Sequence, residues 1–169
     1  IPLRLVGSEM CIRDRHIANM GLPKGSSIAI ASPNSISACL TFMGIVYGGY
    51  VALPLNLVAG AKVLGYTLAH SKAALIFVQS DCQDMIQEAM QEAKSTANTC
   101  PLDLNDGPQW LENSPATSKP NAPIDNPNAA SIGVLMYTSG TTGNPKGVML
   151  SHHNFCLLYT SPSPRDVEE

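Results

Sequence analysis

The side chains best suited to chemistry stand together in one short segment, residues 137–147. Its glycines allow positive φ angles and close backbone approach, and successive backbone N–H groups in such a turn form an anion-binding nest. Hydroxyl groups and one ammonium add further donors. No Asp or Glu occurs between Ser131 and Phe155, so no carboxylate in this stretch repels a negative ligand. The segment therefore predicts a site for a polyanion, such as the phosphates of a nucleotide.

The candidate phosphate-binding residues are defined by these donor types. They are Thr138, Ser139, Gly140, Thr141, Thr142, Gly143 and Lys146. The segment is not a Walker loop, because Lys146 follows Pro145 where that loop requires Gly, and Gly147 follows where it requires Ser or Thr. On composition alone, a solvent-exposed Ser/Thr/Gly turn is an equally good interpretation.

Strands and helices alternate before this segment and would position it. The hydrophobic pattern predicts strands at 27–31, 50–55, 74–78 and 132–137, and helices at 35–47, 61–70 and 82–93. Such alternation predicts an α/β domain with a largely parallel sheet. Ligands in these folds collect at the carboxyl ends of strands, which is where the strand at 132–137 meets the donor-rich segment.

Local signals refine the first helix and the helix at 82–93. Asn34 or Ser35 can cap the first helix, and Ser80 and Gln83 form a possible capping box before the later one. The residues expected on the apolar face of the first helix are Ile36, Cys39, Leu40, Met43 and Tyr47.

Two further stretches have their own patterns. Six prolines between Lys94 and Ala130 exclude a long helix and indicate a surface excursion with room for one or two short strands. Ser151 is expected to cap another helix, with His152 and His153 in its first turn. A ligand role for either histidine is the less favoured alternative.

Composition excludes some partners. The net charge of −3, without a Lys/Arg cluster, argues against nucleic acid as a partner. Five cysteines without CxxC or metal-ligand spacing indicate a reduced compartment, so an intracellular, cytoplasmic location is expected. The span between Lys24 and Lys62 has no charged side chain, but Gly48-Gly49 and Pro54 interrupt it. This favours a buried helix followed by a buried strand over a transmembrane segment.

The residues from Tyr137 onward read Tyr-Thr-Ser-Gly-Thr-Thr-Gly-Asn-Pro-Lys-Gly-Val-Met-Leu-Ser-His. This run resembles the signature of the adenylate-forming (AMP-binding) superfamily, which includes acyl-CoA synthetases, luciferases and peptide-synthetase adenylation domains. Lys24-Gly25, Pro33-Asn34-Ser35 and Pro54-Leu55-Asn56 agree with the same resemblance. Residues 16–155 resemble the early part of that family's large N-terminal domain, so the resemblance implies an incomplete part of that domain.

The resemblance implies an ATP-dependent acid–thiol ligase. In such enzymes ATP and a carboxylic acid form an acyl-adenylate and release pyrophosphate, and coenzyme A then takes the acyl group. A fatty acid is the expected substrate, with Mg²⁺ accompanying ATP. The resemblance implies that the β- and γ-phosphates would be held by Thr138, Ser139, Thr141, Thr142 and Lys146, with Gly140 and Gly143 as further phosphate-binding residues. A domain that loads a carrier protein and a catalytically silent nucleotide-binding fragment are the alternatives. No catalytic residue and no metal ligand is expected in this chain, which is itself expected to be inactive.

Both ends of the chain resemble translated sequencing adapter. Residues 157–166 can be encoded by a string that resembles a common transposase adapter, and its reverse complement encodes residues 5–14 in a shifted frame. Two unrelated protein segments should not be reverse complements of each other. Residues 1–15 and 156–169 are therefore expected to be non-native, leaving 16–155 as a partial AMP-binding domain. Native ends of low information are the alternative.

Overall fold

The computed structural model describes residues 17–18, 20–102, 128–138 and 144–154. The strands are β1 (Ser27–Ala31), β2 (Val51–Pro54), β3 (Leu75–Val78), β4 (Asn98–Pro101), β5 (Ile132–Thr138) and β6 (Lys146–Ser151). The helices are α2 (Ile36–Tyr47), α3 (Ala61–Ser71) and α4 (Gln83–Ala93). Two 3₁₀ turns, η1 (Leu57–Ala59) and η2 (Ser80–Cys82), precede α3 and α4.

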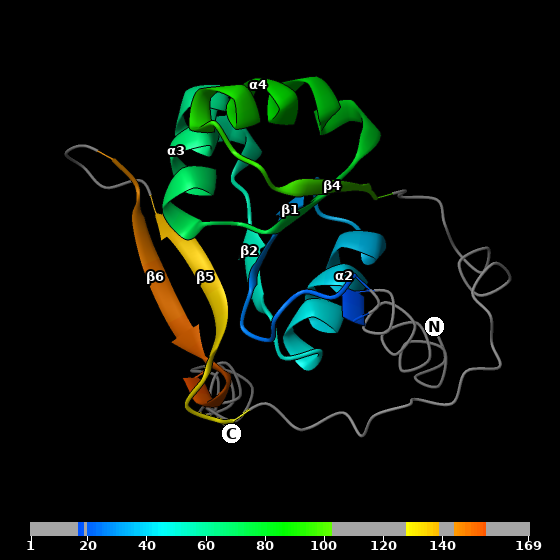
Figure 1. The fold of residues 1–169 in the computed structure, drawn as a ribbon, viewed down its shortest axis with the longest axis vertical. Helices are drawn as coiled ribbons and strands as arrows, with labels where there is room; N and C mark the ends of the chain where they lie inside the picture. Colours follow the sequence, from blue (N-terminus) through cyan, green and yellow to red (C-terminus); the bar gives the residue numbers. More distant parts are fainter. Residues whose placement is uncertain (1–16, 19, 103–127, 139–143, 155–169) are drawn as a thin grey trace, which may run out of the picture.

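The strands form one sheet in the order β4-β3-β1-β2-β5-β6 (Figure 1). Strand β1 pairs in parallel with β2 and β3, β3 with β4, and β2 with β5, whereas β6 pairs antiparallel with β5. The predicted α/β fold with a largely parallel sheet is confirmed. Strand β3 is buried at every residue, as expected for a parallel strand covered on both faces.

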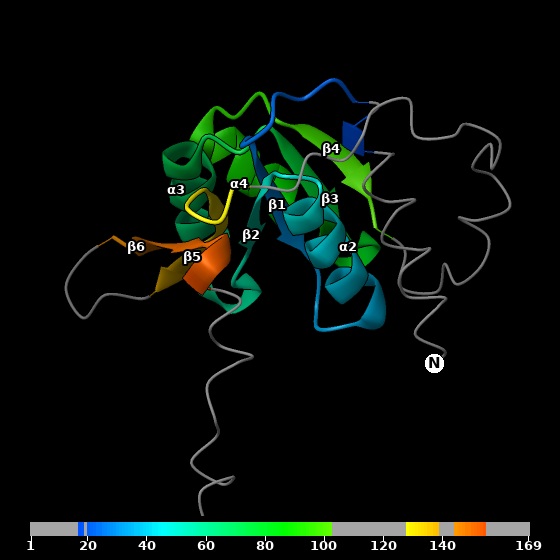
Figure 2. The same ribbon diagram turned by 90° about the horizontal axis from the view of Figure 1, so that it is seen from below.

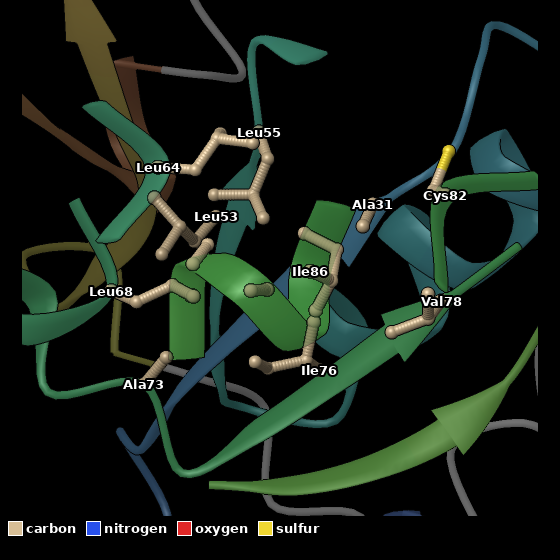
Figure 3. Close-up of a cluster of buried hydrophobic side chains, with 12 residues drawn as sticks. Ala31, Leu53, Leu55, Leu64, Leu68, Ala73, Ile76, Val78, Cys82 and Ile86 are labelled. Atoms are coloured by element: carbon tan, nitrogen blue, oxygen red, sulfur yellow. The ribbon is translucent and has the colours of Figure 1, made fainter. Parts of the chain in front are cut away.

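Helices cover both faces of the sheet. Figures 1 and 2 show α3 and α4 together on one side and α2 on the other. Leu64 and Leu68 of α3 and Ile86 of α4 pack on Leu53 and Ile76 of the sheet (Figure 3). The opposite core includes Ile45 and Val46 of α2 with Ile28, Ala52 and Val134 of the strands. The sheet is therefore held between two apolar layers.

The face that α2 turns to the sheet differs from the expected one. Leu40 is buried as predicted, but Ile36 is 65% exposed, Tyr47 is 41% exposed and Cys39 is also exposed. The helix is apolar nearly all round, so residue spacing cannot select its inner face. Small side chains occupy much of that face and allow a close approach to the sheet. The buried residues of α2 are Ser37, Leu40, Thr41, Gly44, Ile45 and Val46.

Capping was predicted correctly for α2 and wrongly for α4. The Ala38 N–H donates to Ser35 Oγ at 3.0 Å, which makes Ser35 the N-cap. In contrast, Ser80 begins η2, and α4 starts at Gln83 without a side-chain cap bond. The Cys82 N–H donates to the Gln79 carbonyl at 2.9 Å. A backbone turn thus leads into α4 where a capping box was expected.

The charge-free span between Lys24 and Lys62 folds into β1, α2 and β2. Within the described ranges, no helix has the length and apolar character needed to cross a bilayer. Strand β4 lies in the proline-rich excursion, which agrees with the room left there for a short strand. Residues 103–127 of that excursion lie outside the described residues.

Candidate functional site

The donor-rich segment is carried by two paired strands, β5 and β6 (Figure 1). Thr138, the last residue of β5, is aligned directly with Lys146, the first residue of β6. The structure therefore brings these two predicted site residues together. The other predicted site residues lie outside the described residues: Ser139, Gly140, Thr141, Thr142 and Gly143.

The hairpin stem ends at the expected edge of the sheet. Strand β5 runs parallel to β2, with Val134 aligned to Ala52. Thr138 therefore lies at the carboxyl edge of the parallel strands, where ligands of α/β proteins collect. Thr138 and Lys146 are both exposed. Residues directly opposite in an antiparallel pair point to the same face with Cβ atoms about 4.5–5.5 Å apart, so a hydroxyl and an ammonium stand side by side.

Thr138 and Lys146 share one side of the hairpin with Val134 and Leu150, which pack in the core with α2. We call the outer end of this side, beyond Val134 and Leu150, the open face. The preceding pair on this face is Met136 and Val148, which are 46% and 44% exposed. No carboxylate occurs between Ser131 and Phe155, so the Lys146 charge has no acidic neighbour within the hairpin. The open face thus combines a hydroxyl, a cation without a carboxylate in its own hairpin, and accessible apolar surface.

The other side, the closed face, carries Leu135, Tyr137 and Gly147 together with Met149, which is 64% exposed. Leu135 and Tyr137 pack against the apolar core beneath α3 and α4. A Cβ atom placed on Gly147 would lie 3.2 Å from Leu135 Cδ1 and 3.3 Å from Tyr137 Cζ. The absence of a side chain at Gly147 therefore lets the Tyr137 ring lie directly over β6.

Tyr137 also contacts α3 through a residue that sequence analysis did not single out. Its hydroxyl lies 2.6 Å from His70 Nδ1, and the two rings meet edge to face with centroids 5.7 Å apart. Tyr66 stacks on His70 at 5.5 Å. Burial, and secondarily the nearby Tyr66, raises the pKa of Tyr137 above its ordinary value. The (i, i+4) spacing of Tyr66 and His70 predicts that they share a helix face, but nothing local indicates Tyr137 as their partner.

The two histidines after β6 lie at the opposite end of the hairpin from Lys146. The Asn154 N–H donates to Ser151 Oγ at 3.2 Å, so Ser151 caps the following turn as predicted. The His152 imidazole packs on Gly133, where an added Cβ would lie 3.1 Å from the ring. Burial lowers the pKa of His152. In the described part of the chain, no three His, Cys, Asp or Glu side chains converge on a possible metal position.

The paired stem residues can bind and neutralise an anion. A threonine hydroxyl donates one hydrogen bond, and a lysine ammonium offers three N–H donors with a full positive charge. Bonds to charged partners contribute about 1.5–3 kcal/mol each, so a few such donors suffice to hold a phosphate chain. Neither Thr138 nor Lys146 has an adjacent base in the hairpin stem, which argues for positioning rather than nucleophilic chemistry.

Comparison with known proteins shows which family the chain resembles. The family model described as AMP-binding enzyme matches residues 15–167. Sulfoacetate–CoA ligase of Cupriavidus necator is 36% identical over 152 residues, covering 88% of this chain and 29% of that protein. Long-chain-fatty-acid–CoA ligase FadD13 of Mycobacterium tuberculosis is 30% identical over 140 residues, covering 80% of this chain and 26% of that protein.

A solved structure is also similar to this chain. ATP-bound MatB from Rhodopseudomonas palustris matches with a TM-score of 0.74 and 27% sequence identity, covering 92% of this chain and 30% of that one. The chain thus spans less than a third of the length of each of these three proteins. Because the family match extends over almost the whole sequence and includes the glycine-rich hairpin, the chain belongs to the family of AMP-binding enzymes.

Proposed function

We propose that this chain forms the part of an ATP-dependent acid–thiol ligase that holds the phosphates of ATP. The pairing of Thr138 with Lys146 at the carboxyl edge of the sheet carries this proposal. It puts a hydroxyl at one end and a cation at the other end of a glycine-rich segment that contains no carboxylate. The solved structure of MatB has ATP bound, which supports ATP as the nucleotide.

In the proposed reaction, a carboxylate oxygen attacks the α-phosphorus of ATP, the bond from that phosphorus to the bridging oxygen breaks, and pyrophosphate leaves. The thiol of coenzyme A then attacks the acyl carbonyl, and AMP leaves. Lys146 would neutralise charge on the β- and γ-phosphates, and Thr138 would donate its hydroxyl proton to a phosphate oxygen. The same role is proposed for Ser139, Gly140, Thr141, Thr142 and Gly143.

Magnesium would enter this reaction as part of the MgATP substrate. The stem offers a hydroxyl and an ammonium, and residues 131–155 contain no carboxylate. Hard divalent cations prefer oxygen ligands, carboxylates and phosphates above all. The phosphate oxygens of ATP therefore supply the better ligands, and the proposal assigns no magnesium ligand to this chain.

The acid is proposed to be a fatty acid. The long-chain-fatty-acid–CoA ligase among the relatives supports this choice, whereas the more similar sulfoacetate–CoA ligase supports a short, charged acid. We also propose that residues 16–155 are the native part of the chain, that the chain alone does not complete the reaction, and that the ligase works in the cytoplasm.

Pyrophosphate exchange tests this function in the product of the complete reading frame. Exchange of labelled pyrophosphate into ATP is expected with palmitate, and acyl-CoA is expected once coenzyme A is added. Exchange with sulfoacetate alone would change the assigned acid. Exchange followed by acylation of a carrier protein but not of coenzyme A would change the acceptor. Binding of ATP without exchange for any acid would favour a silent nucleotide-binding protein.

Lys146→Ala is the most direct variant. It removes the ammonium at the stem, and loss of one preorganised donor corresponds to about 3 kcal/mol, or roughly a 100-fold slower exchange. Lys62→Ala is the matched control, because it removes an exposed lysine from α3. Both variants are expected to have the melting temperature of the parent protein. Parental exchange rates in Lys146→Ala would contradict the proposed role of the hairpin.

A further inference from the structure

Tyr137 ties the hairpin stem to α3. Tyr137 precedes Thr138 directly, and its hydroxyl reaches His70 at 2.6 Å across 67 positions of sequence. The same ring lies over Gly147, the residue after Lys146. This side chain of β5 therefore contacts both α3 and β6, next to the two residues that carry the proposed phosphate donors.

The helix side of this contact is firmly held. Leu64 and Leu68 of α3 are each 1% exposed in the core, which fixes the orientation of the helix. His70 lies at the end of the same helix, and Tyr66 one turn earlier stacks on its ring with an interplanar angle of 21°. A tyrosine side chain has few rotatable bonds, so a partner at each end of Tyr137 leaves it little freedom.

The hydrogen bond has a defined chemistry. Because burial raises the pKa of Tyr137, its phenol keeps the proton in neutral solution. The O–H group can then donate to His70 Nδ1, with the remaining imidazole proton on Nε2. Replacing the hydroxyl removes this bond while the ring remains over Gly147.

We propose that Tyr137, anchored by His70, is a positioning residue that fixes the hairpin stem against α3 and so places Thr138 and Lys146 to bind the β- and γ-phosphates of ATP. Thr138 and Lys146 are held by the strands that carry them, so the placement of both donors depends on how the hairpin stem is anchored to the domain. This inference rests on the proposed function. Tyr137 and His70 act through Thr138 and Lys146 and do not themselves touch the nucleotide.

Calorimetric titration of the complete reading-frame product with MgATP, magnesium pyrophosphate and AMP tests the inference. Tyr137→Phe is expected to weaken binding of ATP and pyrophosphate by about three- to tenfold, the size of one net hydrogen bond. Binding of AMP, which lacks the β- and γ-phosphates, is expected to stay within twofold. Tyr47→Phe is the matched control, because it removes a tyrosine hydroxyl from α2 on the other face of the sheet.

A second pair of variants keeps the test decisive if Tyr137→Phe folds poorly. His70→Asn leaves an amide near the Nδ1 position and is expected to restore most of the phosphate affinity that His70→Ala loses. Equal affinities in these two variants, or an equal loss for AMP, would overturn the positioning role.

Lys146→Ala separates the two proposals. If it weakens ATP and pyrophosphate binding while Tyr137→Phe does not, the positioning role fails and the phosphate site stands. If Lys146→Ala leaves both affinities unchanged, the phosphate site fails, and the positioning role fails with it.

Discussion

The two faces of the β5–β6 hairpin differ in how their side chains pack near Thr138 and Lys146. On the closed face, Leu135 and Tyr137 pack into the core beneath α3 and α4. On the open face, Met136 and Val148 remain nearly half exposed beside Thr138 and Lys146. Strand alternation assigns successive residues to opposite faces, so neighbouring positions in the sequence serve different purposes.

This difference separates stability from binding. Burial of apolar area on the closed face holds the hairpin against the domain. Thr138 and Lys146 on the open face are the proposed donors for a ligand. The exposed side chains of this face are expected to contribute little to folding, because surface side chains away from packed features change stability only slightly. Substitutions at adjacent residues can therefore test each role with the other as its control.

The largest difference in the free energy of unfolding is expected between Leu135→Ala and Met136→Ala. Leu135 packs on the core, so its truncation is expected to lower the free energy of unfolding by about 2 kcal/mol, at the low end for leucine because it is only partly buried. Met136 is 46% exposed, and its truncation is expected to cost less than about 0.5 kcal/mol. Urea denaturation of both variants measures the difference. Equal losses would show that the two faces do not differ in packing.

A smaller difference is expected between Gly147→Ala and Val148→Ala. The added methyl group at Gly147 must displace Leu135 or Tyr137 by a few tenths of an ångström, which is expected to cost about 1 kcal/mol. Val148 lies on the open face, so loss of its side chain is expected to change stability by less than about 0.5 kcal/mol. Thermal melting of the two variants side by side checks this order, and the reverse order would count against the close packing of Tyr137 on β6.

The smallest effect concerns His152 at the far end of the hairpin. Burial lowers the pKa of its imidazole in the folded state, so the fold favours the neutral ring. The resulting stability is present above the unfolded pKa of about 6.5 and is lost as pH falls below it. Melting curves between pH 7 and pH 5 are expected to show a steeper decline for the parent than for His152→Gln. If the melting temperatures of the two proteins fell equally with pH, His152 would not be the cause of the pH dependence.

The sequence predicted the parallel core more fully than the hairpin. Strands β1 and β3 are apolar runs between helices, and their pattern is typical of strands covered on both faces. The inner face of α2 could not be read in this way, because apolar residues surround the helix and small residues such as Ser37 and Gly44 decide how closely it approaches the sheet. Strand β6 was not predicted, since its three apolar residues are too short a run to define a period.

The residue types of the candidate site were apparent from the sequence, but the contacts that hold the hairpin in place were not. Residue types alone indicated the donors at Thr138 and Lys146, and strand order indicated the edge of the sheet at which they lie. The contact between Tyr137 and His70 joins residues 67 positions apart, and no local pattern encodes such a distance. The pairing of Thr138 with Lys146 likewise became visible only with the register of β5 on β6.

The place of β5 beside β2, and not beside the preceding strand β4, has a consequence for how the chain folds. Strands β1 to β4 are joined to one another by short crossover connections. Strand β5, in contrast, pairs with β2, from which it is separated in the chain by α3, β3, α4 and β4. Closing such a long stretch is entropically costly, so non-local pairings of this kind form late. The β5–β6 hairpin, with Thr138 and Lys146 at its end, is therefore expected to join a sheet whose other four strands are already in place.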